Sequence, residues 1–370
     1  MGLVRTFGVK GFRQAESSSH ISDMKSQKKG IQVWMVLLPA CALLLQARCS
    51  KVQQLTLPEE HTIVSYNVEN LFDMVDDPTT DDTEYNAGGK LQWDESKYTT
   101  KLQHIAEVMQ AIDTTGPVII GLCEVESDKS LRDLVNQPFF KKNKYAFVHR
   151  DSPDERGVDV ALLYRLGQFD VTGKKWYSVP LSDANDRTRE ILYVKGELKG
   201  KPIHVFVNHW PSRSKGQEAS EPDRIAAAKV LRAKLDSISA TDADARIVCM
   251  GDFNDHPNDK SMREALGAGS RTDGASVYVN EMWEVNERKE GSHFYKGEWG
   301  ALDQFVVSKP MASANTGITV IGEGSVWKNK LVLFFDKEGN GRPNRTYVGN
   351  DYKGGYSDHL PIVLKVALKP

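Results

Sequence analysis

Short apolar runs bounded by Gly, Pro or Asp recur along this chain of 370 residues. Runs of this length and composition are typical of buried β-strands. Two amphipathic patterns of helical period lie among them, over residues 101–112 and 222–238, and Pro222 suits the start of the second helix. Because strands and helices do not alternate strictly, we predict an α/β (α+β) fold of packed mixed sheets flanked by helices. The predicted strands cover residues 62–66, 118–122, 145–148, 158–164, 191–195, 203–208, 247–250, 302–307 and 361–366.

Three of these runs have acidic residues at one end. Residues 118–122 lead into Glu124, residues 247–250 lead into Asp252, and Asp358-His359 precedes residues 361–366. Carboxylates at strand ends meet at one rim of a sheet, where open α/β folds carry their chemistry. Attack of water on a phosphoester creates charge that a divalent cation with oxygen ligands neutralises. This pattern therefore indicates a metal-dependent phosphoester hydrolase.

Each acid also has a structural interpretation. Glu124 directly ends an apolar strand and is the best candidate metal ligand, with Glu126 expected on the same face, although an acid there can equally cap a helix. Asp252 can orient a water, and Asn254, two residues on, can hold a phosphoryl oxygen, although the same string also suits a turn rich in Asx residues.

Imidazoles end two further runs. His359 follows Asp358, but adjacent strand residues face opposite ways, so we expect Asp303 to orient His359 instead. A carboxylate at this position raises the pKa of the imidazole, and the resulting cation stabilises a phosphoryl oxygen. His209, at the end of residues 203–208, supplies the second imidazole.

The ordered strings SYNVENLF at residues 65–72, CEV at 123–125, RGVDVA at 156–161, NHWPSR at 208–213, GDFN at 251–254, LDQ at 302–304 and SDH at 357–359 resemble the endonuclease/exonuclease/phosphatase superfamily. This superfamily includes deoxyribonuclease I-like nucleases, sphingomyelinases and inositol-polyphosphate phosphatases. The strings look most like those of its exported bacterial nuclease-like members. The resemblance implies a four-layer sandwich, with two mixed β-sheets face to face between helices.

The resemblance also implies roles for single residues. One or two Mg²⁺ or Mn²⁺ ions would bind at Glu124, with Asn67 and Asp358 close by. Asp252 would orient the attacking water. Phosphate would be held or stabilised by the side chains of Arg156, His209, Asn254 and His359, with Asp303 orienting His359.

Substrate class depends on the surrounding loops. Arg213, Lys215 and Lys353 place basic groups beside the motifs, as a groove for a nucleic-acid strand would. We therefore predict an endonuclease acting on DNA or RNA. Alternatives are a sphingomyelinase-like or inositol-phosphate enzyme acting on a phospholipid or inositol phosphate, or a surface binding protein without catalysis. The 48 basic and 50 acidic residues give a net charge of −2, so any nucleic-acid contact must be local. No obligate protein partner is evident.

The N-terminal part, residues 1–49, reads as an extension and a signal peptide, with Met24 as the expected true start. Lysines at 25, 28 and 29 precede an uncharged apolar stretch over residues 31–47, which is the layout of a secretory signal, with an anchor helix as the alternative. Export to the periplasm, secretion, or lipid anchoring through Cys49 would follow.

Residues 60–370 show no linker and are expected to form one catalytic domain. Cys123 and Cys249 lie within predicted core strands and are expected to be buried thiols. Residues 76–94 and 322–355 are expected to be loops or insertions.

Overall fold

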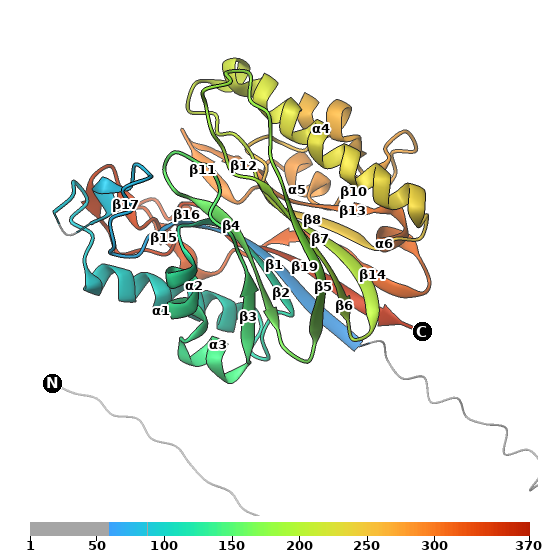
Figure 1. Cartoon of the computed structure of the whole chain (residues 1–370), viewed down its shortest axis with the longest axis horizontal. Helices are drawn as coiled ribbons and strands as arrows, with labels where there is room; N and C mark the ends of the chain where they lie inside the picture. The colour runs from blue at the N-terminus through green and yellow to red at the C-terminus, as the bar shows by residue number, and fades with distance from the viewer. Residues whose placement is uncertain (1–58, 87) are drawn as a thin grey trace, which may run out of the picture. The chain divides into compact units, whose positions relative to one another are not determined.

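The computed structural model describes residues 59–86 and 88–370, and within them two mixed sheets pack face to face (Figure 1). The first sheet has the order β14-β19-β1-β2-β4-β3 and the second β5-β6-β7-β8-β13-β10-β9. Parallel pairing is confined to β1 with β2, β7 with β8, and β10 with β9, and all other neighbours in the two sheets are antiparallel. The strands are β1 (Glu59–Leu71), β2 (Ile119–Val125), β3 (Tyr145–Val148), β4 (Asp159–Arg165), β5 (Phe169–Tyr177), β6 (Ile191–Leu198), β7 (Lys201–His209), β8 (Ile247–Asp252), β9 (Ala268–Gly269), β10 (Tyr278–Asn280), β13 (Asp303–Ser308), β14 (Gly317–Val326) and β19 (Ile362–Lys369).

Helices cover the outer faces of both sheets. α1 (Glu95–Ile112), α2 (Asp128–Val135) and α3 (Pro138–Lys142) pack on the first sheet, and α4 (Gln217–Thr241) packs on the second (Figure 1). Two short helices, α5 (Trp283–Glu287) and α6 (Lys309–Ser313), flank β13 in sequence. The predicted fold of packed mixed sheets between helices is therefore confirmed.

The alternation of side chains along each strand builds three apolar layers. On β1, Ile63 faces the second sheet and Val64 faces the helices, and both are fully buried. On β8, Met250 packs between the sheets, whereas Cys249 packs on the α4 side. Each such side chain contributes roughly 1.5–3 kcal/mol when fully buried. Cys123 and Cys249 are both buried free thiols, as predicted.

Several elements differ from the sequence-based prediction. α4 begins at Gln217, so Pro222 lies inside the helix and not at its start. β5 is an edge strand in which apolar and polar residues are mixed and only Phe169 is buried, and it therefore lacks an apolar run. The segment expected to be a loop over residues 322–355 contains the end of β14 and two small hairpins, β15 (Leu333–Phe335) with β16 (Gly341–Pro343) and β17 (Tyr347–Val348) with β18 (Asp351–Tyr352).

The predicted signal peptide, with Met24 and Cys49, lies outside the described residues. Among the residues that the structure describes, no helix is long and apolar enough to cross a membrane.

Candidate active site

Left-handed backbone is concentrated where β1, β2 and β8 end. Glu69, Asn70, Glu124 and Asn254 have φ values of 53°, 60°, 64° and 52°. The pairing register of β1 and β2 shifts between Asn67 and Leu71, and that of β2 and β4 shifts at Glu124. Each such residue costs about 1–3 kcal/mol, and strain of this kind gathers at functional sites.

The bulge at Glu124 directs its side chain into the site. It also breaks the alternation that would have put Glu126 on the same face. Glu126 instead accepts a hydrogen bond from the backbone N–H of Asp73 at 2.6 Å, away from Glu124. The prediction for Glu126 was therefore wrong, because a bulge reverses the facing of the residues that follow it.

Asn67 bridges the two principal carboxylates. Its Nδ2 donates to Oε1 of Glu124 and to Oδ2 of Asp252, both at 3.2 Å. Its Oδ1 accepts from the backbone N–H of Glu69 at 3.0 Å, which fixes the orientation of the amide. Asn70 N–H donates to Oε2 of Glu124 at 3.1 Å. In this arrangement Asn67 orients the carboxylates and turns no oxygen toward them.

Both predicted imidazoles lie at Asp252. Nε2 of His209 and Nε2 of His359 are each 3.8 Å from Oδ2 of Asp252. His209 Nε2 is also 3.8 Å from Oε1 of Glu124. Nδ1 of His359 is 2.6 Å from Oδ2 of Asp303, and the hydroxyl of Ser292 donates to the same oxygen at 2.5 Å. Asp303 thus lies within hydrogen-bond reach of the His359 ring, which is the pairing expected from the sequence.

Burial and charge give the two imidazoles opposite protonation. Burial disfavours the His359 cation, but attraction by Asp303 and Asp252 outweighs it and raises the pKa of His359 well above its ordinary value. Burial, together with the charges of Arg189 and Arg156, holds the pKa of His209 well below its ordinary value. Burial and the neighbouring Asp303 and Glu124 charges raise the pKa of Asp252 to about 6, against the pull of His359.

The GDFN string ends β8 and bends the chain directly after it, and its glycine stands within the strand, close to β7. A Cβ on Gly251, whose φ is 134°, would lie 1.9 Å from the backbone oxygen of Asn208 on β7. The bend returns Asn254 to the site, where its backbone N–H donates to Oδ1 of Asp252 at 2.9 Å. Its Nδ2 donates to the backbone oxygen of Trp210 at 3.0 Å, so the amide is held beside His209.

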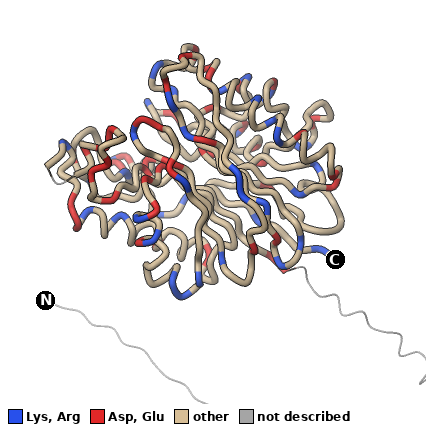
Figure 2. The backbone as a smooth tube through the Cα atoms, viewed as in Figure 1, with Lys and Arg blue, Asp and Glu red and all other residues tan. Residues whose placement is uncertain are grey.

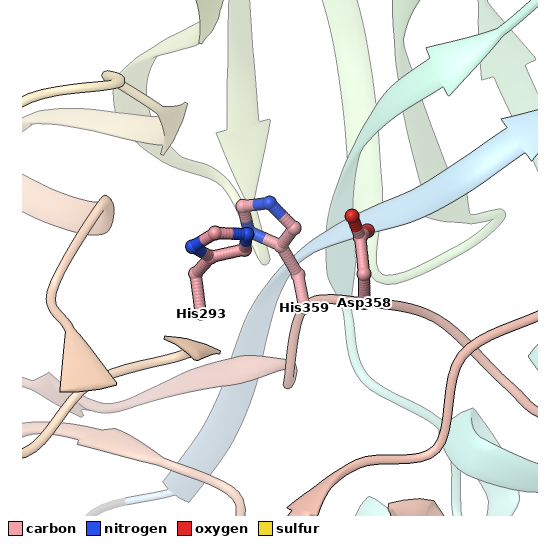
Figure 3. A group of neighbouring side chains, drawn as sticks. All are labelled: His293, Asp358 and His359. Carbon is pink, nitrogen blue, oxygen red and sulfur yellow. The ribbon is translucent and has the colours of Figure 1, made fainter. Parts of the chain in front are cut away.

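Asp358 lies at the other side of the site, next to two residues that sequence reasoning did not select. Nη2 of Arg345 is 3.0 Å from Oδ2 of Asp358. His293, on β11 (His293–Tyr295), packs against His359 with ring centroids 4.7 Å apart and ring planes tilted by 38°. Figure 3 shows His293, Asp358 and His359 together, and their potential ligand atoms lie within 4.8 Å of one another. Both missed residues come from polar segments without an apolar run, which is the signal that located the others.

Two of the predicted basic residues, Arg156 and Lys215, line one cavity of about 200 Å³ together with Arg187 and Arg189. Arg213 donates to Asp255 at 3.1 Å and to Asp259 at 2.9 Å, behind Asn254. Lys215 is 69% exposed and pairs with Asp186 at 2.5 Å, whereas Lys353 pairs with Asp351 near the β17–β18 hairpin at 3.3 Å. Arg156 is 50% exposed and lines a cavity of about 660 Å³ beside Asn70.

A further cavity, of about 310 Å³, shares Asn70, Glu84, Tyr85 and Lys90 with the cavity of about 660 Å³. It is bounded by Lys90, Tyr85, Tyr347 and Arg345. Tyr85 stacks on Phe72 at 4.1 Å and is shared by both cavities. Asp and Glu gather around this lobe, which the segment after β1 and the β17–β18 hairpin form (Figure 2). Neither cavity has Glu124, Asp252, His209 or His359 in its lining.

The donor groups fit a hard divalent cation. Glu124 is only partly buried, and both of its carboxylate oxygens are oriented by hydrogen bonds from Asn67 and Asn70. Carboxylate oxygens are the ligands that Mg²⁺ and Mn²⁺ prefer. Glu124 is therefore the residue best placed to hold such an ion.

A sequence model of the Endonuclease/Exonuclease/phosphatase family matches residues 62–368. This chain belongs to the endonuclease/exonuclease/phosphatase family. No curated protein matches the sequence of this family member.

Solved structures share its fold. An endonuclease/exonuclease/phosphatase family protein from Bacteroides thetaiotaomicron is similar with a TM-score of 0.52 and 18% identity, over 84% of this chain and 99% of that one. A mannosyl-6-phosphatase of the same species has a TM-score of 0.51 and 18% identity, over 83% and 100% of the two chains. The catalytic domain of human nocturnin with bound sulfate has a TM-score of 0.52 and 16% identity, over 84% and 95%. At these identities the likeness shows the deoxyribonuclease I-like fold of the family.

Proposed function

We propose that this family member is a phosphoester hydrolase that depends on Mg²⁺ or Mn²⁺. The observation that carries the proposal is the position of Asp252. Oδ2 of Asp252 lies near the amide of Asn67 and the imidazoles of His209 and His359. Asn67 also donates to Glu124, the candidate metal ligand, and so links the two carboxylates. This is the set of groups that metal-assisted attack of water on phosphorus requires.

The charge of each side chain determines its role in the proposed reaction. Glu124 would hold the ion, which neutralises charge on the phosphate when bound. Asp252, once ionised, orients the water and accepts its proton. The His359 cation, kept charged by Asp303, stabilises a phosphoryl oxygen. His209 is neutral at pH 7, and with the Asn254 amide it can hydrogen-bond the phosphate without adding charge.

Substrate class is the second part of the proposal. Arg213, Lys215 and Lys353 each lie beside an aspartate, so their local fields largely cancel and a polynucleotide backbone gains little from them. A small phosphorylated compound therefore suits the site better than the DNA or RNA expected from sequence. Nucleic acid remains the alternative, followed by a phospholipid or inositol phosphate.

One experiment separates these classes. The purified protein is incubated with plasmid DNA, RNA, sphingomyelin, an inositol phosphate and a sugar phosphate, each with Mg²⁺ and with EDTA. We expect metal-dependent release from at least one small phosphoester. If no substrate is hydrolysed at any metal concentration, the remaining candidate is a binding protein that keeps the fold without catalysis.

We also propose that the protein is exported, on the basis of the lysines and the apolar stretch before residue 48. Mass spectrometry of the mature protein tests this proposal. A new N-terminus at or near Cys49 supports it, with an added lipid on Cys49 in the anchored form. An intact N-terminus in the cytoplasmic fraction contradicts it.

A further inference from the structure

The guanidinium of Arg345 lies between two carboxylates at the edge of the site. Nη2 is 3.0 Å from Oδ2 of Asp358, and Nε is 3.5 Å from Oε1 of Glu69. Glu69 is buried and Asp358 is partly buried, so neither is well screened by water. Two acids this close repel each other unless a cation lies between them.

The same Asp358 belongs to the group that could otherwise bind a transition metal. Its carboxylate is grouped with the imidazoles of His293 and His359 (Figure 3). Two imidazoles and a carboxylate are a ligand set for Mn²⁺, Co²⁺ or Zn²⁺. An ion there would have to compete with Arg345 for Asp358.

Hydrogen bonds hold the backbone at Arg345, which fixes where its side chain starts. The next residue, Thr346, donates its backbone N–H to Oε2 of Glu69 at 2.6 Å. The Thr346 hydroxyl accepts from the buried Nζ of Lys101, also at 2.6 Å. The backbone oxygen of Arg345 accepts from the N–H of Gly355 at 3.1 Å. A guanidinium keeps its charge at every physiological pH, so this side chain, which is 44% exposed, is a permanent positive charge beside both carboxylates.

We propose that Arg345 takes the place of a second metal ion. It holds Asp358 and Glu69, prevents a cation from binding at His293, Asp358 and His359, and leaves the enzyme with one divalent ion, at Glu124. The inference rests on the proposed function in one respect, since it assigns the hydrolytic ion to Glu124. It also removes Asp358 from the predicted metal ligands.

Counting bound ions tests this assignment without measuring activity. Equilibrium dialysis of the whole protein against Mn²⁺ should give one tightly bound ion per chain. Arg345→Ala should gain a second ion, and His293→Ala added to it should return the count to one. Arg345→Lys, which keeps the charge, should stay at one. Lys353→Ala is the matched control, because it removes an exposed cation from the same inserted segment, and it should also stay at one.

Two tightly bound ions in the unaltered protein would overturn the proposal, as would a folded Arg345→Ala protein that still binds only one. If Arg345→Ala fails to fold, Asp358→Asn decides. The count should remain at one if Arg345 already occupies that carboxylate, and should fall if Asp358 ligates a metal. A protein that binds one ion and hydrolyses nothing would refute the proposed function and leave this inference standing.

Discussion

The carboxyl group of Asp252 sets the pH range in which hydrolysis can occur. Its pKa is raised to about 6, chiefly by burial, and only the ionised form can accept the proton of water. We expect kcat/KM to rise with pH and to level off by about pH 7, since a bound cation lowers this pKa further. A pH–rate profile measures the acid limb, and a limb centred above pH 7 would contradict the assignment. Asp252→Asn should lose the limb and roughly two to four decades of turnover.

Glu124 is the residue whose change should affect metal binding most. Glu124→Gln keeps the shape and removes the charge that attracts the ion, so apparent Mg²⁺ affinity and activity should fall together by about tenfold or more. Metal titrations of activity and of Mn²⁺ binding measure both. Glu126→Gln is the control, because Glu126 faces Asp73 and should leave Mg²⁺ affinity unchanged. Unchanged affinity in Glu124→Gln would refute its role.

His149 provides a pH-dependent contribution to stability. Its ring nitrogens lie 2.9 Å from Asp128 and 3.1 Å from Asp159, and although burial opposes the cation, these carboxylates raise its pKa. The stabilisation is therefore present below the unfolded value of about 6.5 and is lost as pH rises through the folded pKa. His149→Gln should cost about 1–3 kcal/mol at pH 6 and less at pH 9.5, as measured by urea unfolding. An equal cost at both pH values would show that the ring contributes packing alone.

Sequence reasoning found the site residues that stand at the ends of apolar strands. Glu124, Asp252 and His209 follow such runs, so their meeting at one rim could be predicted. The backbone conformation of Glu124 could not, because a bulge depends on pairing with two neighbouring strands. Arg345 and His293 were missed because only tertiary packing brings their polar segments to Asp358 and His359.

At the scale of elements, the inserted segment before β19 holds the rim of the site. It leaves β16 at Pro343, forms the β17–β18 hairpin and returns at Gly355, where it passes close to its own start. A Cβ on Gly355 would lie 2.2 Å from the oxygen of Asn344 and 2.3 Å from that of Arg345. These are backbone atoms, so an added methyl must push the strands of the insertion apart.

We therefore expect Gly355→Ala to lower stability by about 1–3 kcal/mol and activity by more than tenfold, since Arg345 and Asp358 lie on either side of the contact. Thermal unfolding and kcat measure the two effects. Gly274→Ala is the matched control, because a Cβ there meets nothing within 4 Å. If both variants behave alike, the close approach at Gly355 does not position the site.

The same insertion shows which kind of strand could not be predicted from the sequence. Central strands such as β8 and β13 are buried on both faces and appear as apolar runs, so they were predicted within a few residues. The β15–β16 and β17–β18 hairpins have few buried side chains, and nothing in their composition separates them from loops. α4 was placed correctly, but its polar first turn hid the true start before Pro222.

At the scale of the whole molecule, charge limits what the site can attract. The net charge of −2 gives no long-range field for a polyanion, and acidic residues gather near one side of the site (Figure 2). The proposed export, which rests on residues 31–47 and Cys49, would expose the protein to extracellular phosphoesters.

Salt dependence measures how far a polyanion is bound through basic side chains. Each phosphate contact made by Lys or Arg contributes a slope of about −0.7 to −0.9 in log affinity against log salt. Lys215 and Lys353 each lie beside an aspartate, so we expect the double variant Lys215→Ala/Lys353→Ala to leave the salt slope of plasmid cleavage within about one unit of the original. Its kcat/KM on a small phosphoester should also be unchanged, which shows that the site is intact.

Arg156→Ala is the contrasting variant, because Arg156 lines the cavity beside Asn70. It should lower kcat/KM for both plasmid and small phosphoester about tenfold. A slope flattened by about 1.4–1.8 units in the double variant, which is the loss of two phosphate contacts, with small-substrate kinetics preserved, would return the assignment to an endonuclease.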